Sequence, residues 1–194
     1  MIAAVFVDRD GVLNELVPHP VSSRPESPLD PEQVVLVPGA AAALRRLHNA
    51  GYVVVGVSNQ PAAAKGTVDI KQLESVQARV LDLLERAGAA TDAFRLCFHH
   101  PEGVVPELTR VCNCRKPAPG MLLDAAAELK LDLSASWMIG DTDGDVAAGV
   151  AAGCRTILIE NLASAHKRSG RVRPDATAPD LAAAVDFVIA SRAR

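Results

Sequence analysis

The chain has 194 residues, of which 49% are hydrophobic and 22% are charged, and its formal net charge at pH 7 is -3. This acidic balance argues against a nucleic-acid binder, which would need an excess of Lys and Arg to displace counterions from phosphates. No apolar run reaches the ~18 residues of a membrane span, and the first apolar run lacks the basic start of a signal peptide, so we expect a cytoplasmic protein with one domain over 1–194.

Short β-branched runs alternate along the chain with amphipathic stretches rich in Ala and Leu. Strands are predicted at 2–7, 52–57, 93–98, 136–139 and 156–160. Helices are predicted at 39–50, 70–87, 120–130, 145–152 and 180–190. The segments 18–38 and 161–179 have little periodicity and are predicted to be surface loops. Several strands are apolar at consecutive positions, which is typical of parallel strands covered on both faces. The pattern predicts an α/β fold: a Rossmann-like, open, mostly parallel sheet with helices on both faces.

Three helix ends have recognisable signals. Asp69 and Gln72 resemble a capping box at the start of the second helix. Gly51 and Gly88 stand where a glycine in the left-handed conformation commonly ends a helix.

The residues that follow the predicted strands are unusually polar. Ligands of open α/β sheets bind outside the carboxyl ends of the strands, so the residues at these positions are expected to lie at the ligand-binding site. In chain order they are Asp8 and Asp10, then Ser58, Asn59 and Gln60, then Arg115 and Lys116, then Asp141, Asp143 and Asp145. A lone Asp at such a position is as often a turn or cap residue, but four suitable endings on four consecutive strands are hard to explain as loops alone.

This set of side chains fits phosphoryl transfer. A carboxylate can attack phosphorus and form an acyl-phosphate, which divides one difficult hydrolysis into two easier steps. Because carboxylates repel a phosphate dianion, Mg²⁺ bound by oxygen ligands is needed to neutralise the charge. A fixed Lys and a hydroxyl can stabilise the transferring oxygens, and a second carboxylate can transfer protons.

The segments "DRDGV", "SNQ", "RKP" and "GDTDGD" resemble, in the same order, the four motifs of the haloacid dehalogenase superfamily of phosphatases. The resemblance implies that Asp8 is the nucleophile and Asp10 the general acid/base. It implies that Ser58 and Lys116 bind the phosphate, with help from the backbone of Asn59. It implies that Mg²⁺ is held by Asp8, the Asp10 carbonyl and Asp141, with Asp145 behind these ligands. We expect Asp143 to be a solvated turn or helix-start residue.

Three of the four cysteines lie in one short segment, as Cys97-x-His99 and Cys112-x-Cys114. Three thiolates and an imidazole suit a closed tetrahedral Zn²⁺ site without an open position for catalysis. His100 is the competing imidazole, and we favour His99 because its spacing mirrors that of the cysteine pair. The plainer alternative is one buried Cys and two incidental surface thiols. We expect Cys154 to be a small buried apolar residue.

The predicted zinc loop, 97–114, ends directly before Arg115 and Lys116. Zinc would therefore fix the backbone that carries the phosphate-binding lysine, which a flexible loop could not hold with the accuracy that catalysis requires. In this interpretation zinc is structural and magnesium is catalytic.

The zinc loop, with "HHPEG" at its start and "CRKP" at its end, is similar to that of the D-glycero-D-manno-heptose 1,7-bisphosphate 7-phosphatases and the histidinol-phosphate phosphatases. Both groups are compact and have no large cap domain, and this chain has no room for one between Asp10 and Ser58. Three positions depart from the pattern. Phe98 replaces a common proline, Lys65 stands in the place of an arginine, and Thr142 follows Asp141 where a basic residue is frequent.

The resemblance and the cations favour a small sugar bisphosphate, first of all heptose 1,7-bisphosphate, cleaved at its primary phosphate. Arg115 and Lys65 are expected to bind the remote phosphate. Histidinol phosphate or another small phosphorylated metabolite is the alternative. The amine of histidinol phosphate would be repelled by these cations unless Asp143 or Glu102 lines the rim.

A third alternative is a zinc module without enzymatic activity that uses the basic run 166–173 to bind protein or nucleic acid. The small share of aromatic residues, 3%, weakens it because such sites use stacking side chains. We expect instead a small phosphorylated metabolite as partner, no nucleic acid, no membrane and a monomeric protein.

Overall fold

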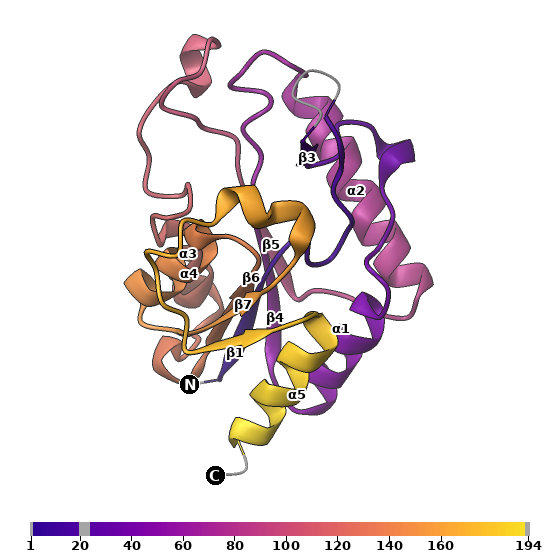
Figure 1. Cartoon of the computed structure of the whole chain (residues 1–194), viewed down its shortest axis with the longest axis vertical. Coiled ribbons are helices and arrows are strands. Elements are labelled where there is room, and N and C mark those ends of the chain that lie inside the picture. Colours follow the sequence, from indigo (N-terminus) through magenta and orange to yellow (C-terminus); the bar gives the residue numbers. More distant parts are fainter. Residues whose placement is uncertain (1, 20–23, 193–194) are drawn as a thin grey trace.

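The computed structural model describes residues 2–19 and 24–192, and its centre is one sheet of six parallel strands (Figure 1). The order across the sheet is β5-β4-β1-β6-β7-β8. The strands are β1 (Ala4–Asp8), β4 (Val53–Asn59), β5 (Ala93–Cys97), β6 (Trp137–Gly140), β7 (Arg155–Ile159) and β8 (Ala176–Ala178). The five predicted strands and the predicted fold class are confirmed.

Helices cover both faces of the sheet. They are α1 (Ala40–Asn49), α2 (Ile70–Arg86), α3 (Gly120–Leu129), α4 (Asp143–Ala152) and α5 (Leu181–Arg192). Val5 and Val7 of β1 belong to the apolar cluster that includes side chains of α1, α2 and α5. Ala4 and Phe6, which alternate with them, belong to the second cluster, with α3 and α4. Because successive side chains of a strand point to opposite faces, one fully apolar strand supplies both cores.

The two segments predicted as loops contain short elements. A two-stranded antiparallel hairpin, β2 (Val17–Pro18) with β3 (Pro25–Glu26), and a 3-10 helix, η1 (Pro31–Gln33), lie in the first. The second holds η4 (Leu162–Lys167) and β8. The prediction was wrong there because elements of two to six residues have no measurable periodicity. Residues 20–23 of the first segment lie outside the described residues.

Two further 3-10 helices, η2 (Pro106–Leu108) and η3 (Leu133–Ala135), lie in connections between the main elements. In the part of the chain that the structure describes, no helix is long and apolar enough to cross a membrane. No cap domain is present among the described residues between β1 and β4.

The helix-end signals are largely confirmed. Gly51 and Gly88 have φ angles of 79° and 71°. The Asp69 carboxylate accepts a hydrogen bond of 2.8 Å from the backbone N–H of Gln72. The reciprocal half of the capping box is wrong, because the Gln72 amide donates to the carbonyl of Leu29 instead.

The strand order explains how residues far apart in the sequence meet. β1 pairs with β4 on one side and with β6 on the other, in both cases parallel. Their carboxyl ends therefore lie at the same edge of the sheet, and they bring Asp8, Ser58 and Asp141 to its centre.

Candidate active site

The turn after β1 places Asp8 at the carboxyl edge of the sheet. Its Oδ1 atom accepts a hydrogen bond of 2.8 Å from the backbone N–H of Arg9. Gly11 has a φ angle of 87°, and a Cβ atom on it would lie 2.2 Å from Oδ2 of Asp141. The glycine of "DRDGV" therefore permits both the left-handed turn and the close approach of Asp141.

Lys116 is the buried cation of the site. Its Nζ lies 2.7 Å from Oδ1 of Asp8 and 2.6 Å from Oδ1 of Asp145, and it donates to the carbonyl of Val57 at 3.0 Å. Burial alone would lower the pKa of Lys116, but the charges of Asp145 and Asp8 raise it above its ordinary value. The ammonium therefore remains charged next to Asp8.

The backbone of Lys116 is held by Asn59 at the end of β4. The Asn59 side chain accepts from the N–H of Lys116 at 3.1 Å and donates to its carbonyl at 2.9 Å. From the sequence only the backbone of Asn59 was expected to take part, so this role of its side chain was not predicted. No sequence signal could have revealed it, since the two residues are 57 positions apart.

Three carboxylates gather beside this lysine: Asp8, Asp141 and Asp145. One oxygen from each lies within 4.8 Å of the others, and all three residues are buried. Neither oxygen of Asp141 has a hydrogen-bond partner among the described residues. Burial, followed by the charge of Asp145, raises the pKa of Asp141 to about 7. Burial and the same neighbour also raise the pKa of Asp8 well above its ordinary value. Crowded, unpartnered carboxylate oxygens are the donor set that a hard divalent cation such as Mg²⁺ prefers.

Asp10 lies apart from these carboxylates, and hydrogen-bond donors surround its side chain. Its Oδ2 accepts from Gln60 Nε2 at 2.6 Å and from Ser58 Oγ at 3.2 Å, and its Oδ1 accepts from Asn14 at 3.1 Å. Burial alone would raise the pKa of Asp10. The charge and hydrogen bonds of Arg9 and the bond from Asn14 outweigh it and lower the pKa. The carboxyl group is therefore ionised in this arrangement.

Arg9 is fully buried, which the sequence analysis did not anticipate. Two of its nitrogens donate to Oδ1 of Asp10 at 3.0 and 3.1 Å, and a third donates to Gln77 of α2 at 3.2 Å. A charged residue in a turn is expected to be exposed. Here the neighbouring carboxylate of Asp10 and the Gln77 amide of α2 satisfy the guanidinium, and Gln77 is 68 positions away in the chain.

The remaining acidic residues after β6, Asp143 and Asp145, have different partners. Asp145 Oδ2 accepts from the N–H and the hydroxyl of Thr142 at 3.0 and 2.5 Å, which holds its other oxygen toward Lys116. Asp143 Oδ2 instead accepts from the N–H and hydroxyl of Ser169, both at 2.6 Å. Asp143 therefore faces a surface loop.

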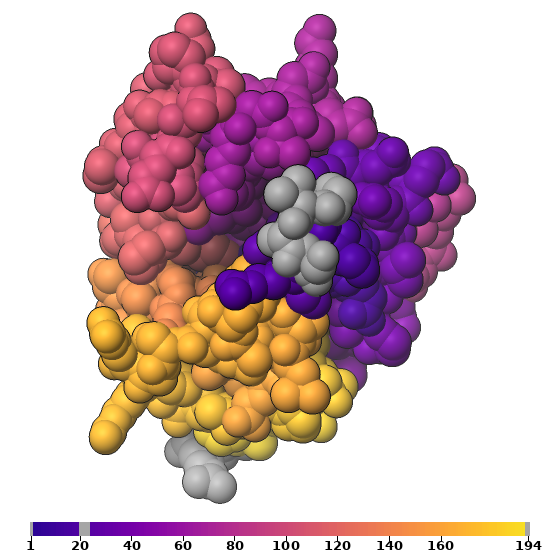
Figure 2. Space-filling view, turned by 45° about the horizontal axis from the view of Figure 1, so that its top comes forward, coloured from indigo at the N-terminus to yellow at the C-terminus, as the bar shows by residue number. Residues whose placement is uncertain are grey.

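A cavity of about 330 Å³ lies next to Asp8, Asp10, Lys116 and Asp145. It is lined by Asp8, Asp10, Glu26, Ser27, Ser58, Asn59, Pro61, Lys65, Arg115, Lys116, Thr142, Gly144, Asp145 and Lys167. Figure 2 shows the hollow between the magenta, salmon and orange-yellow parts of the surface. Lys65 and Arg115 line it as expected, whereas Glu102 and Asp143 do not. Glu26 was not predicted from the sequence to line the site, and Lys167 was considered only as part of the basic run 166–173.

The loop after β5 brings together a second group: Cys97, His99, Cys112 and Cys114. Their ligand atoms all lie within 4.8 Å of one another, with separations of 3.0–3.7 Å between neighbouring pairs. Two ligand atoms about 2.3 Å from a tetrahedral ion would be about 3.7 Å apart. The group can therefore hold a metal ion.

The other residues considered for this group lie outside it. The ring of His100 accepts a hydrogen bond from the N–H of Glu102 at 3.1 Å, whereas Nδ1 of His99 faces the thiols. Cys154 is buried in the apolar cluster of α3 and α4, as expected. Cys114 directly precedes Arg115 and Lys116, so the metal-binding group and the cavity share one stretch of backbone.

Comparisons with known proteins agree with this geometry. A family model described as HAD-hydrolase-like matches residues 113–184. The chain is 40% identical to a D-glycero-beta-D-manno-heptose-1,7-bisphosphate 7-phosphatase of Rhodopseudomonas palustris over 77% of this chain and 79% of that protein. It is 37% identical to a D-glycero-D-manno-heptose-1,7-bisphosphate 7-phosphatase of Thermosynechococcus vestitus over 95% and 94% of the two chains.

A solved structure is also similar. The D,D-heptose 1,7-bisphosphate phosphatase of B. bronchiseptica, complexed with magnesium and phosphate, superimposes with a TM-score of 0.75 at 29% identity, over 98% of this chain and 99% of that one. These matches exclude the interpretation of the chain as a zinc module without enzymatic activity. The chain belongs to the haloacid dehalogenase-like phosphatases, in the family that contains the heptose bisphosphate phosphatases.

Proposed function

We propose that this phosphatase removes the primary phosphate of a small sugar bisphosphate through an aspartyl-phosphate on Asp8, and that D-glycero-D-manno-heptose 1,7-bisphosphate is its preferred substrate. The observation that carries the proposal is the contact of 2.7 Å between Lys116 Nζ and Asp8 Oδ1 beside two further buried carboxylates. An acceptor carboxylate, a fixed cation and a metal-binding donor set are the parts that phosphoryl transfer requires.

In the first step Asp8 attacks phosphorus and the alkoxide leaves. Lys116 and Ser58 bind the phosphoryl oxygens, with the backbone of Asn59 as a further donor, and Asp145 keeps the lysine in place. Mg²⁺, bound by Asp8, the Asp10 carbonyl and Asp141, would neutralise the negative charge of the phosphoryl group. The unpartnered oxygens of Asp141 support this assignment.

Asp10 serves as the acid and then as the base. Its lowered pKa suits the second step, in which an ionised carboxylate takes a proton from the water that hydrolyses the acyl-phosphate. The first step needs the protonated form to protonate the leaving oxygen. A bound phosphate dianion raises the pKa of a neighbouring carboxyl group by like-charge repulsion, which favours protonation when substrate is present.

The Cys97, His99, Cys112 and Cys114 group would hold a structural Zn²⁺. The separations of their sulfur and nitrogen atoms fit a closed tetrahedral site. Reduced thiols suit the cytoplasm.

The substrate is tested by comparing kcat/KM for heptose 1,7-bisphosphate and histidinol phosphate, both with Mg²⁺. Lys65 and Arg115 line the cavity, and they would attract a distal phosphate and repel an amine. Arg115→Ala should lower kcat/KM for the bisphosphate by about 10-fold or more, while Arg86→Ala on the exposed face of α2 should not. Faster hydrolysis of histidinol phosphate by the wild type would reverse the assignment.

A further inference from the structure

We propose that Lys167 of η4 binds the distal phosphate of a bisphosphate substrate, and that Lys167 forms an ion pair with Glu26 when no such phosphate is bound. The inference rests on the function proposed above. It identifies a residue that distinguishes bisphosphates from monophosphates.

Lys167 and Glu26 line the same cavity as Asp8 and Lys116. Lys167 Nζ donates to Oε2 of Glu26 at 2.6 Å, and the pair joins segments 141 positions apart in the chain. The side chains of Lys167 and Glu26 are 30% and 36% exposed, so the pair is reached both from the cavity and from solvent.

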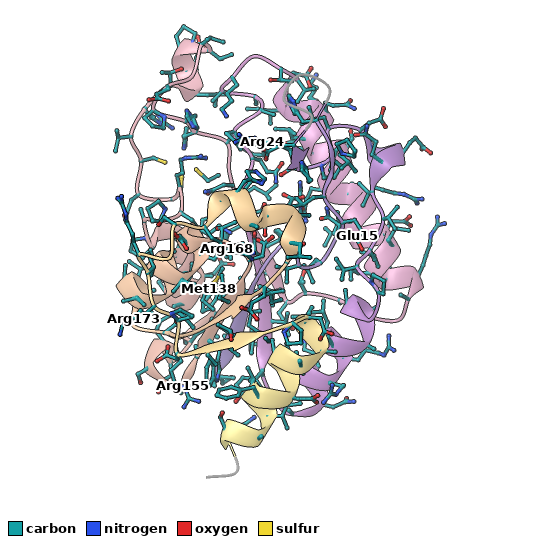
Figure 3. The ribbon with its side chains drawn as sticks, viewed as in Figure 1. Glu15, Arg24, Met138, Arg155, Arg168 and Arg173 are labelled. Carbon is teal, nitrogen blue, oxygen red and sulfur yellow. The ribbon has the colours of Figure 1, made fainter. Side chains whose placement is uncertain are left out.

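η4 is tied to the edge of the sheet that carries the reacting carboxylates. Asn161, at its start, donates to the carbonyl of Gly11 at 3.0 Å. The hydroxyl of Ser164, which is fully buried, lies 3.2 Å from the carbonyl of Asp141. Arg168, labelled in Figure 3 beside this edge, donates to the carbonyl of Ile159 at 3.1 Å. The backbone that carries Lys167 is therefore supported as a binding residue requires.

η4 and the segments that carry the other two cations lie on different sides of the hollow. In Figure 2 the orange-yellow part of the surface, which includes η4, lies on one side of the hollow, and the magenta and salmon parts lie on the other. Lys65 follows β4 and Arg115 follows β5, so they belong to that opposite side. A phosphate between them would be held from two sides.

A phosphate can replace the Glu26 carboxylate at modest cost. An ion pair that is about one-third exposed is screened by water and contributes little. A phosphate group near neutral pH carries more than one negative charge and three acceptor oxygens, so it attracts Lys167 more strongly than a single carboxylate does. A monophosphate has no second phosphate group, so Lys167 remains paired with Glu26.

The test compares Lys167→Gln and wild type with Mg²⁺ on heptose 1,7-bisphosphate and on p-nitrophenyl phosphate, which has no distal phosphate. We expect KM for the bisphosphate to rise by about 10-fold with kcat nearly unchanged, which is the sign of lost binding shared by ground and transition states. KM for p-nitrophenyl phosphate should not change. Glu26→Gln should lower KM for the bisphosphate, because it removes the competing anion. Lys167→Arg should retain most of the binding, and Lys71→Gln on α2 is the matched control.

An unchanged KM for the bisphosphate in Lys167→Gln, or an equal rise for both substrates, would overturn the inference. So would a higher bisphosphate KM in Glu26→Gln, which would make Glu26 itself a ligand. Calorimetric titration of heptose 1,7-bisphosphate into Asp8→Asn and into Asp8→Asn with Lys167→Gln measures binding without turnover. Equal affinities would exclude the role of Lys167 even if the wild type proves inactive, which is the separate failure of the proposed function.

Discussion

The carboxylate site and the Cys/His group lie on either side of Lys116, but they are built in different ways. Asp8, Asp141 and Asp145 are buried; the first two lie at the ends of β1 and β6, which the sheet topology brings together, and Asp145 lies in the first turn of α4. The thiols and imidazole come from the end of β5 and the loop that follows it, and three of the four residues are only half-buried. The first site therefore depends on the whole sheet, and the second on a local segment.

The two groups also differ in their balance of charge. The carboxylates have an internal cation, since Lys116 lies within 2.7 Å of both Asp8 and Asp145. Most close polar contacts of the sulfur and ring-nitrogen atoms in the Cys/His group are to one another. The carboxylate site can thus keep its arrangement without metal. The loop of the Cys/His group has backbone hydrogen bonds of its own, including those from Val104 and Val105 to the carbonyl of Ala64, but an ion would be needed to hold its thiolates together. Four predictions can break or sharpen this contrast.

The largest effect is expected at the proposed nucleophile. Asp8→Asn should lower kcat by about 10⁴-fold or more, because an amide cannot form the acyl-phosphate. Phosphate release under saturating substrate and Mg²⁺ measures it, with circular dichroism to check the fold. Asp143→Asn, which changes a nearby carboxylate that faces Ser169, should retain wild-type activity. Substantial turnover by purified Asp8→Asn would refute the assignment.

Asn59 connects the sheet to the backbone of Lys116. Asn59→Ala removes both hydrogen bonds to that backbone, so kcat should fall by about 10- to 100-fold as the ammonium loses its position. Asn59→Asp keeps the acceptor but not the donor and should fall between Ala and wild type. Steady-state kinetics of the three proteins test this order. An Ala variant with wild-type kcat would mean that the Cys/His loop alone positions Lys116.

Loss of the metal ion from the Cys/His group should lower the stability of the protein more than the rate of catalysis. Wild type should carry about one zinc ion per chain, and Cys112→Ser should lose it. The melting temperature should fall by several degrees, and activity should fall only a few-fold because Lys116 keeps its contacts with Asp8, Asp145 and Asn59. Metal analysis and thermal melting measure both effects.

Cys154→Ala is the control for that experiment, since Cys154 is buried outside the group and its loss should leave the zinc content unchanged. Full activity and stability of a zinc-free wild type would contradict the structural role of the metal.

The smallest expected effect is a pH dependence of stability. The pKa of Asp141 is raised to about 7, so the folded, metal-free protein binds a proton that the unfolded chain releases near pH 4. Stability without Mg²⁺ should therefore fall as pH rises from about 4 to about 7. Mg²⁺ should raise the melting temperature by a few degrees more at pH 8 than at pH 6.

Asp141→Asn should reduce that slope without removing it, because the pKa of Asp8 is raised as well. Thermal melts of both proteins over this pH range, with and without Mg²⁺, provide the measurement. A stability that rises with pH over the same range in Asp141→Asn and in wild type alike would mean that Asp141 is ionised before metal binds.

The sequence by itself determined the elements and groups that depend on local order. Short β-branched runs predicted the five long strands, and several of these runs are apolar at consecutive positions because their strands are buried on both faces. The spacing in Cys97-x-His99 and Cys112-x-Cys114 indicated the metal-binding group, since these residues lie within one loop. The polar residues after the strands were found because parallel strands end at a common edge.

Only the tertiary structure decided which of these side chains touch and what holds them. The bonds from Asn59 to Lys116, the burial of Arg9 against Gln77, the pairing of Lys167 with Glu26 and the addition of β8 to the sheet could not be predicted. Each of these contacts joins segments that are far apart in the sequence, and hydrophobic periodicity describes each segment separately. Such contacts depend on the strand order and on the burial and hydrogen bonding of the whole chain. The residues next to each position in the sequence do not indicate them.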